Sequence, residues 1–131
     1  YGFEQLPALL PDADVVVLLC PLTDQTRGLV NADFISRMRP GALLVNVSRG
    51  PVVVTDDLLD AVQQGSIFAA LDVTDPEPLP PEHPLWRAPG VLISPHVGGN
   101  TSAFLPRAYR LVAEQLARFS QGEPVHHVMS R

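Results

Sequence analysis

The sequence predicts an α/β fold built on a parallel sheet, and three observations point to it. Four short runs rich in Val, Leu, Ile and Ala recur along the 131 residues. They are almost continuously apolar rather than alternating, which is typical of strands covered on both faces, so we expect a doubly wound sheet. About two dozen residues separate successive starts, enough for a crossover helix in a right-handed βαβ unit. The runs are residues 14–20, 42–48, 68–73 and 91–95.

The segments that join these runs carry signals for helices and for one loop. In the first segment Asn31 is a candidate N-cap for a short helix. The second, residues 55–65, is a stronger helix, which Thr55 can cap and Gly65 can end. The third, residues 74–90, is crowded with prolines and predicts an extended surface loop.

A long amphipathic helix is predicted after the last run, within residues 100–122. Its apolar positions follow helical spacing, so we expect this helix to dock on a core. The positions that share this face are Phe104, Ala108, Leu111, Val112, Gln115, Leu116 and Phe119.

Composition and charge narrow the class of protein. The length suits one ordinary domain, and a net charge of −5 argues against nucleic acid or an anionic membrane as a partner. The single cysteine, Cys20, excludes an internal disulfide framework and favours a reducing, cytoplasmic setting. No apolar stretch is long enough to span a membrane. The pair His126-His127 lacks a third ligand nearby in sequence, so no metal is assigned.

Charged and ionisable residues follow three of the predicted strands. Arg49 comes directly after the second run, Asp72 and Glu77 at and after the end of the third, and His96 after the fourth. Ligands of open parallel sheets bind beyond the carboxyl ends of the strands. We therefore expect these four side chains to gather at one edge of the sheet, where Arg49 reaches a cleft rather than the core.

This set of side chains suits the reduction of a carbonyl that neighbours a carboxylate. Arg49 can hold the carboxylate with its forked, permanently charged guanidinium. His96 can donate or accept a proton near neutrality, and Glu77 would favour the imidazolium if it is hydrogen-bonded to His96. Taken singly, each residue is more often structural or solvated, so it is their joint placement that favours the chemical interpretation.

Three stretches closely resemble the C-terminal half of D-isomer-specific 2-hydroxyacid dehydrogenases of the glyoxylate/hydroxypyruvate reductase type. These are "LLVNVSRGPVVVTDDLLDAVQQG", "AALDVTDPEPLPPEHPLW" and "LISPHVGG". Their motifs are specific in combination: Asn-x-x-Arg-Gly, Leu-Asp-Val followed by Glu-Pro, and Pro-His-x-Gly. The resemblance implies a Rossmann-type sheet, NAD or NADP as the cofactor, and hydride transfer between that cofactor and a small 2-oxo or D-2-hydroxy acid.

The same resemblance implies roles for individual residues. The family's catalytic arginine, glutamate and acid/base histidine fall on Arg49, Glu77 and His96, and the aspartate that holds the nicotinamide carboxamide falls on Asp72. The cofactor-binding positions that the resemblance implies are Cys20, Pro21, Val47, Ser48, Arg49, Asp72, His96, Gly98 and Gly99.

One departure from the family pattern sets the expected domain organisation. None of the nine glycines belongs to the Gly-x-Gly-x-x-Gly turn that cradles the pyrophosphate in this family. We therefore expect residues 1–99 to be the later half of a dinucleotide-binding domain, and residues 100–131 a helix and tail that return to a substrate domain. Such a fragment alone would bind NAD poorly and be inactive. Its first strand would present an unpaired apolar edge, which predicts association.

Two alternatives to an oxidoreductase stay open at this point. One is an NAD-sensing binding module like the corepressor relatives of the family, and the other is an inactive half-domain. A homodimer is expected by analogy with the family. The sequence leaves open which 2-hydroxy acid is used and whether NADH or NADPH is preferred.

Overall fold

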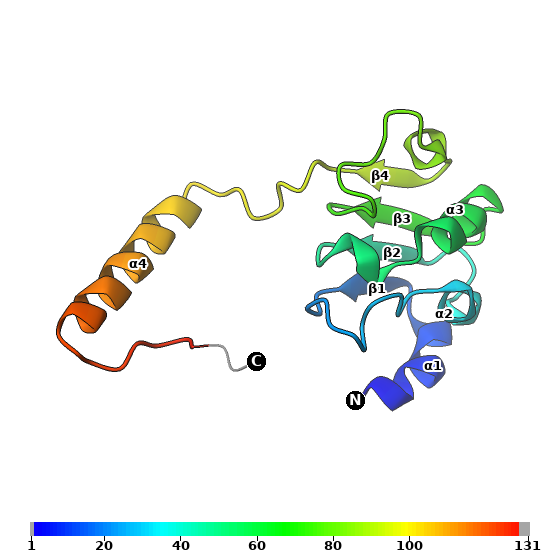
Figure 1. The fold of residues 1–131 in the computed structure, drawn as a ribbon. Coiled ribbons are helices and arrows are strands. Elements are labelled where there is room, and N and C mark those ends of the chain that lie inside the picture. The colour runs from blue at the N-terminus through cyan, green and yellow to red at the C-terminus, as the bar shows by residue number, and fades with distance from the viewer. Residues whose placement is uncertain (1, 129–131) are drawn as a thin grey trace. The chain divides into compact units, whose positions relative to one another are not determined.

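The computed structural model describes residues 2–128, which form two compact units that divide between Val97 and Gly98. The first unit holds a four-stranded, wholly parallel sheet with strands side by side in chain order (Figure 1). This confirms the predicted α/β class with a parallel sheet. The strands are β1 (Val15–Leu18), β2 (Leu43–Asn46), β3 (Phe68–Leu71) and β4 (Val91–Ile93).

The register of the strands makes all four end at the same level. Leu18 lies opposite Asn46, Asn46 opposite Leu71, and Leu71 opposite Ile93, and these are the last residues of their strands. Because parallel strands point the same way, the segments that follow them leave the sheet along one edge. β1 pairs with β2 alone in the described part of the chain, so this apolar strand lies at an edge of the sheet, as expected.

The connecting helices confirm one predicted cap and correct another. The Asn31 side chain accepts a hydrogen bond from the Phe34 N–H at 3.0 Å and caps α2. The Thr55 cap is wrong: Val54 precedes the first turn of α3, and the Thr55 hydroxyl donates to the carbonyl of Asp75 at 2.6 Å instead. The α-helices of the first unit are α1 (Leu6–Leu9), α2 (Ala32–Arg37) and α3 (Thr55–Gln63), and the 3₁₀ helices are η1 (Phe3–Gln5), η2 (Leu10–Asp12), η3 (Gly50–Val52) and η4 (Pro84–Arg87).

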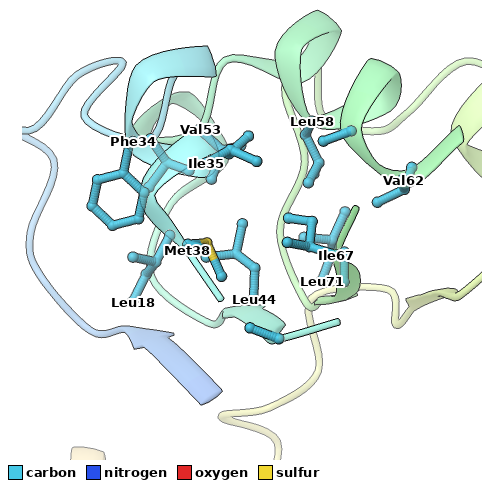
Figure 2. Packing of buried hydrophobic residues seen from close by; sticks show 14 of the residues in the cluster. Leu18, Phe34, Ile35, Met38, Leu44, Val53, Leu58, Val62, Ile67 and Leu71 are labelled. Atoms are coloured by element: carbon cyan, nitrogen blue, oxygen red, sulfur yellow. The ribbon is translucent and has the colours of Figure 1, made fainter. Parts of the chain in front are cut away.

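The core lies on one face of the sheet, where α2 and α3 pack against inward-facing strand residues (Figure 2). Leu44 is fully buried there, and Leu58 of α3 is 2% exposed. On the opposite face Val15, Phe68 and Leu92 are 52%, 51% and 69% exposed. The sequence predicted cover on both faces. When consecutive parallel strands are neighbours in chain order, right-handed crossovers place every connecting helix on the same face, which explains the difference.

The proline-rich connector is less extended than the sequence predicts. It contains η4, whose Leu85 is 2% exposed, and Leu79 ahead of it is 5% exposed. His83 caps η4, since its Nδ1 accepts a hydrogen bond from the Leu85 N–H at 3.2 Å. The two buried leucines therefore hold the connector against the core, and Glu77 lies two residues before the first of them.

The second unit contains the predicted C-terminal helix, α4 (Phe104–Ser120). None of its residues is buried, and Leu116 and Phe119 of its apolar face are 62% and 76% exposed. Docking of this helix stays a prediction, as does the domain boundary at residues 99 and 100. Among residues 2–128, no helix combines the length and apolar character needed to cross a membrane.

Candidate active site

The segment that carries Arg49 is fixed by a buried amide at the end of β2. Asn46 is 1% exposed, and its Oδ1 accepts hydrogen bonds from the Ser48 N–H at 3.0 Å and the Ser48 hydroxyl at 2.9 Å. Its Nδ2 donates to the carbonyl of Arg49 at 3.1 Å. A buried amide needs such partners, and these three bonds fold residues 46–49 into a compact turn. Arg49 itself is exposed, as predicted for a cation that reaches a cleft.

Gly50 follows Arg49 because no larger residue fits there. A Cβ at this position would lie 1.9 Å from the carbonyl oxygen of Thr74, in the segment after β3. The close backbone approach brings the segment after β2 against the segment after β3. The Arg-Gly pair therefore has two causes: the arginine faces solvent, and the glycine lets two strand ends meet.

A cavity of about 510 Å³ lies beside Arg49 at the carboxyl ends of β1 and β2. Five residues that the resemblance assigns to the cofactor line it, together with Leu19 and Leu22: Cys20, Pro21, Val47, Ser48 and Arg49. The Arg49 Nη1 donates to the carbonyl of Ser48 at 2.6 Å, so the guanidinium curls back over its own turn.

His96 and Glu77 form a direct pair at the ends of two different segments. The Nδ1 of His96 lies 2.6 Å from Oε1 of Glu77, with side chains 48% and 40% exposed. An ionised carboxylate only accepts hydrogen bonds, so Nδ1 carries the proton and Nε2 is left for other chemistry. Peptide bonds Asp75–Pro76 and Glu77–Pro78, on either side of Glu77, are both cis.

Asp72 lies directly after β3 and is 9% exposed. Its backbone N–H donates to the carbonyl of Asn46 at 2.9 Å, which extends the ladder of β2 and β3 by one residue. Its Oδ1 accepts hydrogen bonds from the Ser94 hydroxyl at 2.5 Å and from the Val97 N–H at 2.9 Å. The carboxylate thus holds the segment that contains His96.

The predicted site residues fall into three groups in the structure. Asp72, Glu77 and His96 line one cavity of about 150 Å³, while Arg49 lines the larger cavity described above. In the described part of the chain no hydrogen bond joins the Arg49 and His96 side chains. Gly98 and Gly99 belong to the second unit, and their roles stay predictions.

Sequence reasoning missed residues that support the site. Ser94 bonds to Asp72, and Trp86 lines the cavity beside His96 while its indole N–H donates to the carbonyl of Pro80 at 2.9 Å. A polar residue that interrupts an apolar run was the available signal for Ser94, since it ends the run "VLIS". Among residues 2–128 no group of three or more His, Cys, Asp and Glu side chains is arranged to hold a metal ion.

Comparisons with known proteins agree with this fold and these strand ends. The family model described as "D-isomer specific 2-hydroxyacid dehydrogenase, NAD binding domain" matches residues 1–98. Human glyoxylate reductase/hydroxypyruvate reductase is 43% identical over 124 residues, which are 94% of this chain and 38% of the human protein. The chain therefore spans well under half the length of that curated relative.

Two solved structures are similar over nearly the whole chain. A D-isomer specific 2-hydroxyacid dehydrogenase from Xanthobacter autotrophicus, in complex with NADPH and MES, gives a TM-score of 0.87 at 40% identity, covering 98% of this chain and 53% of that one. An NADPH-dependent glyoxylate/hydroxypyruvate reductase from Sinorhizobium meliloti, in complex with NADP and sulfate, gives 0.88 at 34% identity, covering 99% and 42%.

A parallel sheet with a cavity at its carboxyl edge places the first unit among the open α/β folds that bind ligands at this edge. The matching family model covers most of the chain. The chain belongs to the D-isomer specific 2-hydroxyacid dehydrogenase family and matches its NAD binding domain.

The residues present fit part of a dinucleotide. The cavity beside Arg49 combines apolar walls from Pro21 and Val47 with the buried hydroxyl of Ser48. Such a mixture suits a ribose and a flat ring, because ligand pockets combine apolar walls with a few placed polar groups. The Asp72 carboxylate could accept a hydrogen bond from a carboxamide. The chain contains no Gly-x-Gly-x-x-Gly turn for the pyrophosphate.

Proposed function

We propose that this chain is the later half of the nucleotide-binding domain of an NAD(P)-dependent D-2-hydroxyacid dehydrogenase. The proposed substrate is a small 2-oxo acid such as glyoxylate or hydroxypyruvate. The observation that carries the proposal is the 2.6 Å contact between His96 and Glu77, at the same edge of the sheet as Arg49. The relatives' names support the substrate class, since the human and Sinorhizobium proteins are glyoxylate/hydroxypyruvate reductases.

Arg49 would bind the substrate carboxylate. One N–H of its guanidinium donates to the carbonyl of Ser48, and the fork offers further N–H groups to an anion. A bidentate pair fixes the plane of the carboxylate and therefore the direction of the neighbouring carbonyl. The turn built on Asn46 holds the backbone of Arg49 in place, so that only the side chain has to move to reach the substrate.

His96 would exchange the proton. The dinucleotide, when bound, supplies or accepts the hydride. With Nδ1 bonded to Glu77, the Nε2 of His96 gives a proton to the carbonyl oxygen during reduction and takes one from the hydroxyl during oxidation. Ionised Glu77 stabilises the positive imidazolium in the acid form and holds the orientation of the ring. Asp72 holds the His96 segment and would also bind the carboxamide.

The resemblance also supports a homodimer, and together with the single cysteine it supports a cytoplasmic location. A corepressor-type sensing module remains the second candidate, because Arg49, Glu77 and His96 would also persist in such a protein. An inactive half-domain is the third. Turnover and cofactor binding, measured together, separate these three.

The test is made on the protein expressed from its complete reading frame. Oxidation of NADH and NADPH is measured with glyoxylate, hydroxypyruvate and pyruvate. We expect turnover, and we expect His96→Asn to lower kcat by about a thousandfold with little change in cofactor Kd, as for loss of a general acid.

His83→Asn is the matched control. The His83 side chain caps η4, and asparagine is a good cap, so this variant should keep the wild-type rate. Cofactor binding without turnover would favour the sensing module. Failure of both binding and turnover would favour the inactive half-domain, and either result would refute the proposed reaction.

A further inference from the structure

Ser94 directly follows β4, and its hydroxyl donates a hydrogen bond to the carboxylate of Asp72. No chemical step proposed above uses this bond. Its backbone N–H continues the ladder between β3 and β4, donating to the carbonyl of Leu71 at 2.8 Å. We propose that Ser94 is a positioning residue for His96, acting through the carboxylate of Asp72. The inference rests on the proposed function for its kinetic consequences, while its structural part concerns only how the imidazole is held.

The carboxylate of Asp72 is a rigid anchor. It lies one residue beyond β3, is 9% exposed, and its own N–H is bonded to β2 through the carbonyl of Asn46. A carboxylate this buried must accept hydrogen bonds to offset the loss of water. Ser94 and Val97 both donate to the same oxygen, Oδ1, so the positions of these two residues are tied to one atom.

The two donors, Ser94 and Val97, flank His96 in the sequence. Only Pro95 and His96 lie between Ser94 and Val97, and the His96 N–H donates to the carbonyl of Ser94 at 3.0 Å. His96 has φ of 54°, in the left-handed region that side chains other than glycine rarely adopt. This conformation is unfavourable for an L-residue, so it persists because its surroundings impose it.

The left-handed backbone sets the direction of the imidazole. If His96 relaxes to an ordinary φ, its Cβ points elsewhere and the 2.6 Å contact with Glu77 is lost. Ser94 donates one of the hydrogen bonds that tie this turn to Asp72 Oδ1. Its single hydroxyl proton is given to Asp72, which favours a positioning role over donation to a ligand.

Kinetics of the full-length protein provide the first test. Ser94→Ala removes the hydroxyl and Ser94→Thr keeps it. Ser36→Ala is a matched control, because the exposed Ser36 hydroxyl donates to the carbonyl of Asp33 within α2. We expect Ser94→Ala to lower kcat about tenfold with KM and NADPH Kd within about twofold, because a misdirected acid slows proton transfer more than binding. Ser94→Thr should recover most of the rate, and Ser36→Ala should match the wild type.

Nitrogen NMR of selectively ¹⁵N-histidine-labelled protein provides the second test and needs no turnover. In the wild type we expect neutral His96 to carry its proton on Nδ1, since Glu77 accepts it. Ser94→Ala should shift the proton toward Nε2, whereas Ser94→Thr and Ser36→Ala should keep the wild-type pattern.

A Ser94→Ala protein with the wild-type His96 pattern would overturn the positioning role. So would a Kd for NADPH raised about tenfold at unchanged kcat, which would make Ser94 a cofactor ligand. If the wild type shows no turnover at all, the proposed function fails, but the NMR comparison still decides whether Ser94 positions His96.

Discussion

The two strand ends that carry Arg49 and His96 are built from the same parts in different ways. At each, a buried polar side chain accepts hydrogen bonds from a serine hydroxyl and a backbone N–H. Asn46 does this for Ser48, next to Arg49, and Asp72 does it for Ser94 and Val97, around His96. In both, the anchor ends a strand or follows its last residue, and the functional side chain itself remains exposed.

The difference lies in how far each anchor reaches along the chain. Asn46 bonds to residues two and three positions later, so its turn forms with the strand end itself. Asp72 bonds to residues 22 and 25 positions later, so its turn requires β3 and β4 to be paired first. The arginine is therefore placed by local structure and the histidine by tertiary structure. Damage to the sheet should affect His96 before it affects Arg49.

The largest expected effect concerns the point where two strand ends meet. Gly50→Ala places a methyl group 1.9 Å from the Thr74 carbonyl oxygen, which a backbone cannot tolerate without moving. We expect the free energy of unfolding to fall by about 3 kcal/mol in urea denaturation. Gly99→Ala is the matched control, since a Cβ there meets nothing in the described residues. Equal stability of the two variants would contradict the close approach of the two segments.

The next effect isolates the local anchor. Asn46→Ala leaves the buried Ser48 N–H and hydroxyl without their acceptor and removes one of the two donors to the Arg49 carbonyl, which should cost about 2 kcal/mol of unfolding free energy. Asn31→Ala, which removes the side-chain cap of α2, should cost about 1 kcal/mol. The same urea titration measures both. An equal loss in the two variants would mean that the anchor at β2 is no stronger than a helix cap.

The smallest expected effect concerns an exposed carboxylate, that of Asp33 on α2. On α2 the side-chain hydrogen bond from Arg37 lowers the pKa of Asp33, and the charge of Arg37 adds to this. A carboxyl group whose pKa is lowered in the folded chain stabilises the fold at pH values above the ordinary pKa of aspartate. This stabilisation is lost as the pH falls through the pKa of the folded state. Because the pair is solvent-exposed and screened, Arg37→Gln should leave the urea midpoint unchanged at neutral pH and physiological salt. A clear shift would show that exposed pairs matter here.

The sequence predicts the strand end that carries Arg49 better than the one that carries His96, because the first depends on local hydrogen bonds and the second on bonds between residues distant in sequence. Continuous apolar runs give the strands, and the position of Arg49 directly after one of them gives its exposed cation. The bond from Ser94 to Asp72 spans β-strands that are distant in sequence, so no local pattern indicates it. Thr55 shows the same limit. The local sequence predicts that it caps α3, but its hydroxyl donates to the carbonyl of Asp75, which is distant in sequence. One-sided cover of the sheet follows from strand order, which composition alone does not reveal.

The central claim is that Arg49 and His96 act on one substrate although they line separate cavities. A crystal structure of the full-length protein with NADP and oxalate, an unreactive mimic of a 2-oxo acid, tests this most directly. We predict that the Arg49 guanidinium uncurls from Ser48 to pair with a carboxylate of oxalate, and that Nε2 of His96 lies within about 3 Å of an oxygen on the neighbouring carbon. Oxalate bound away from Arg49, or a His96 ring that faces away from it, would contradict the account.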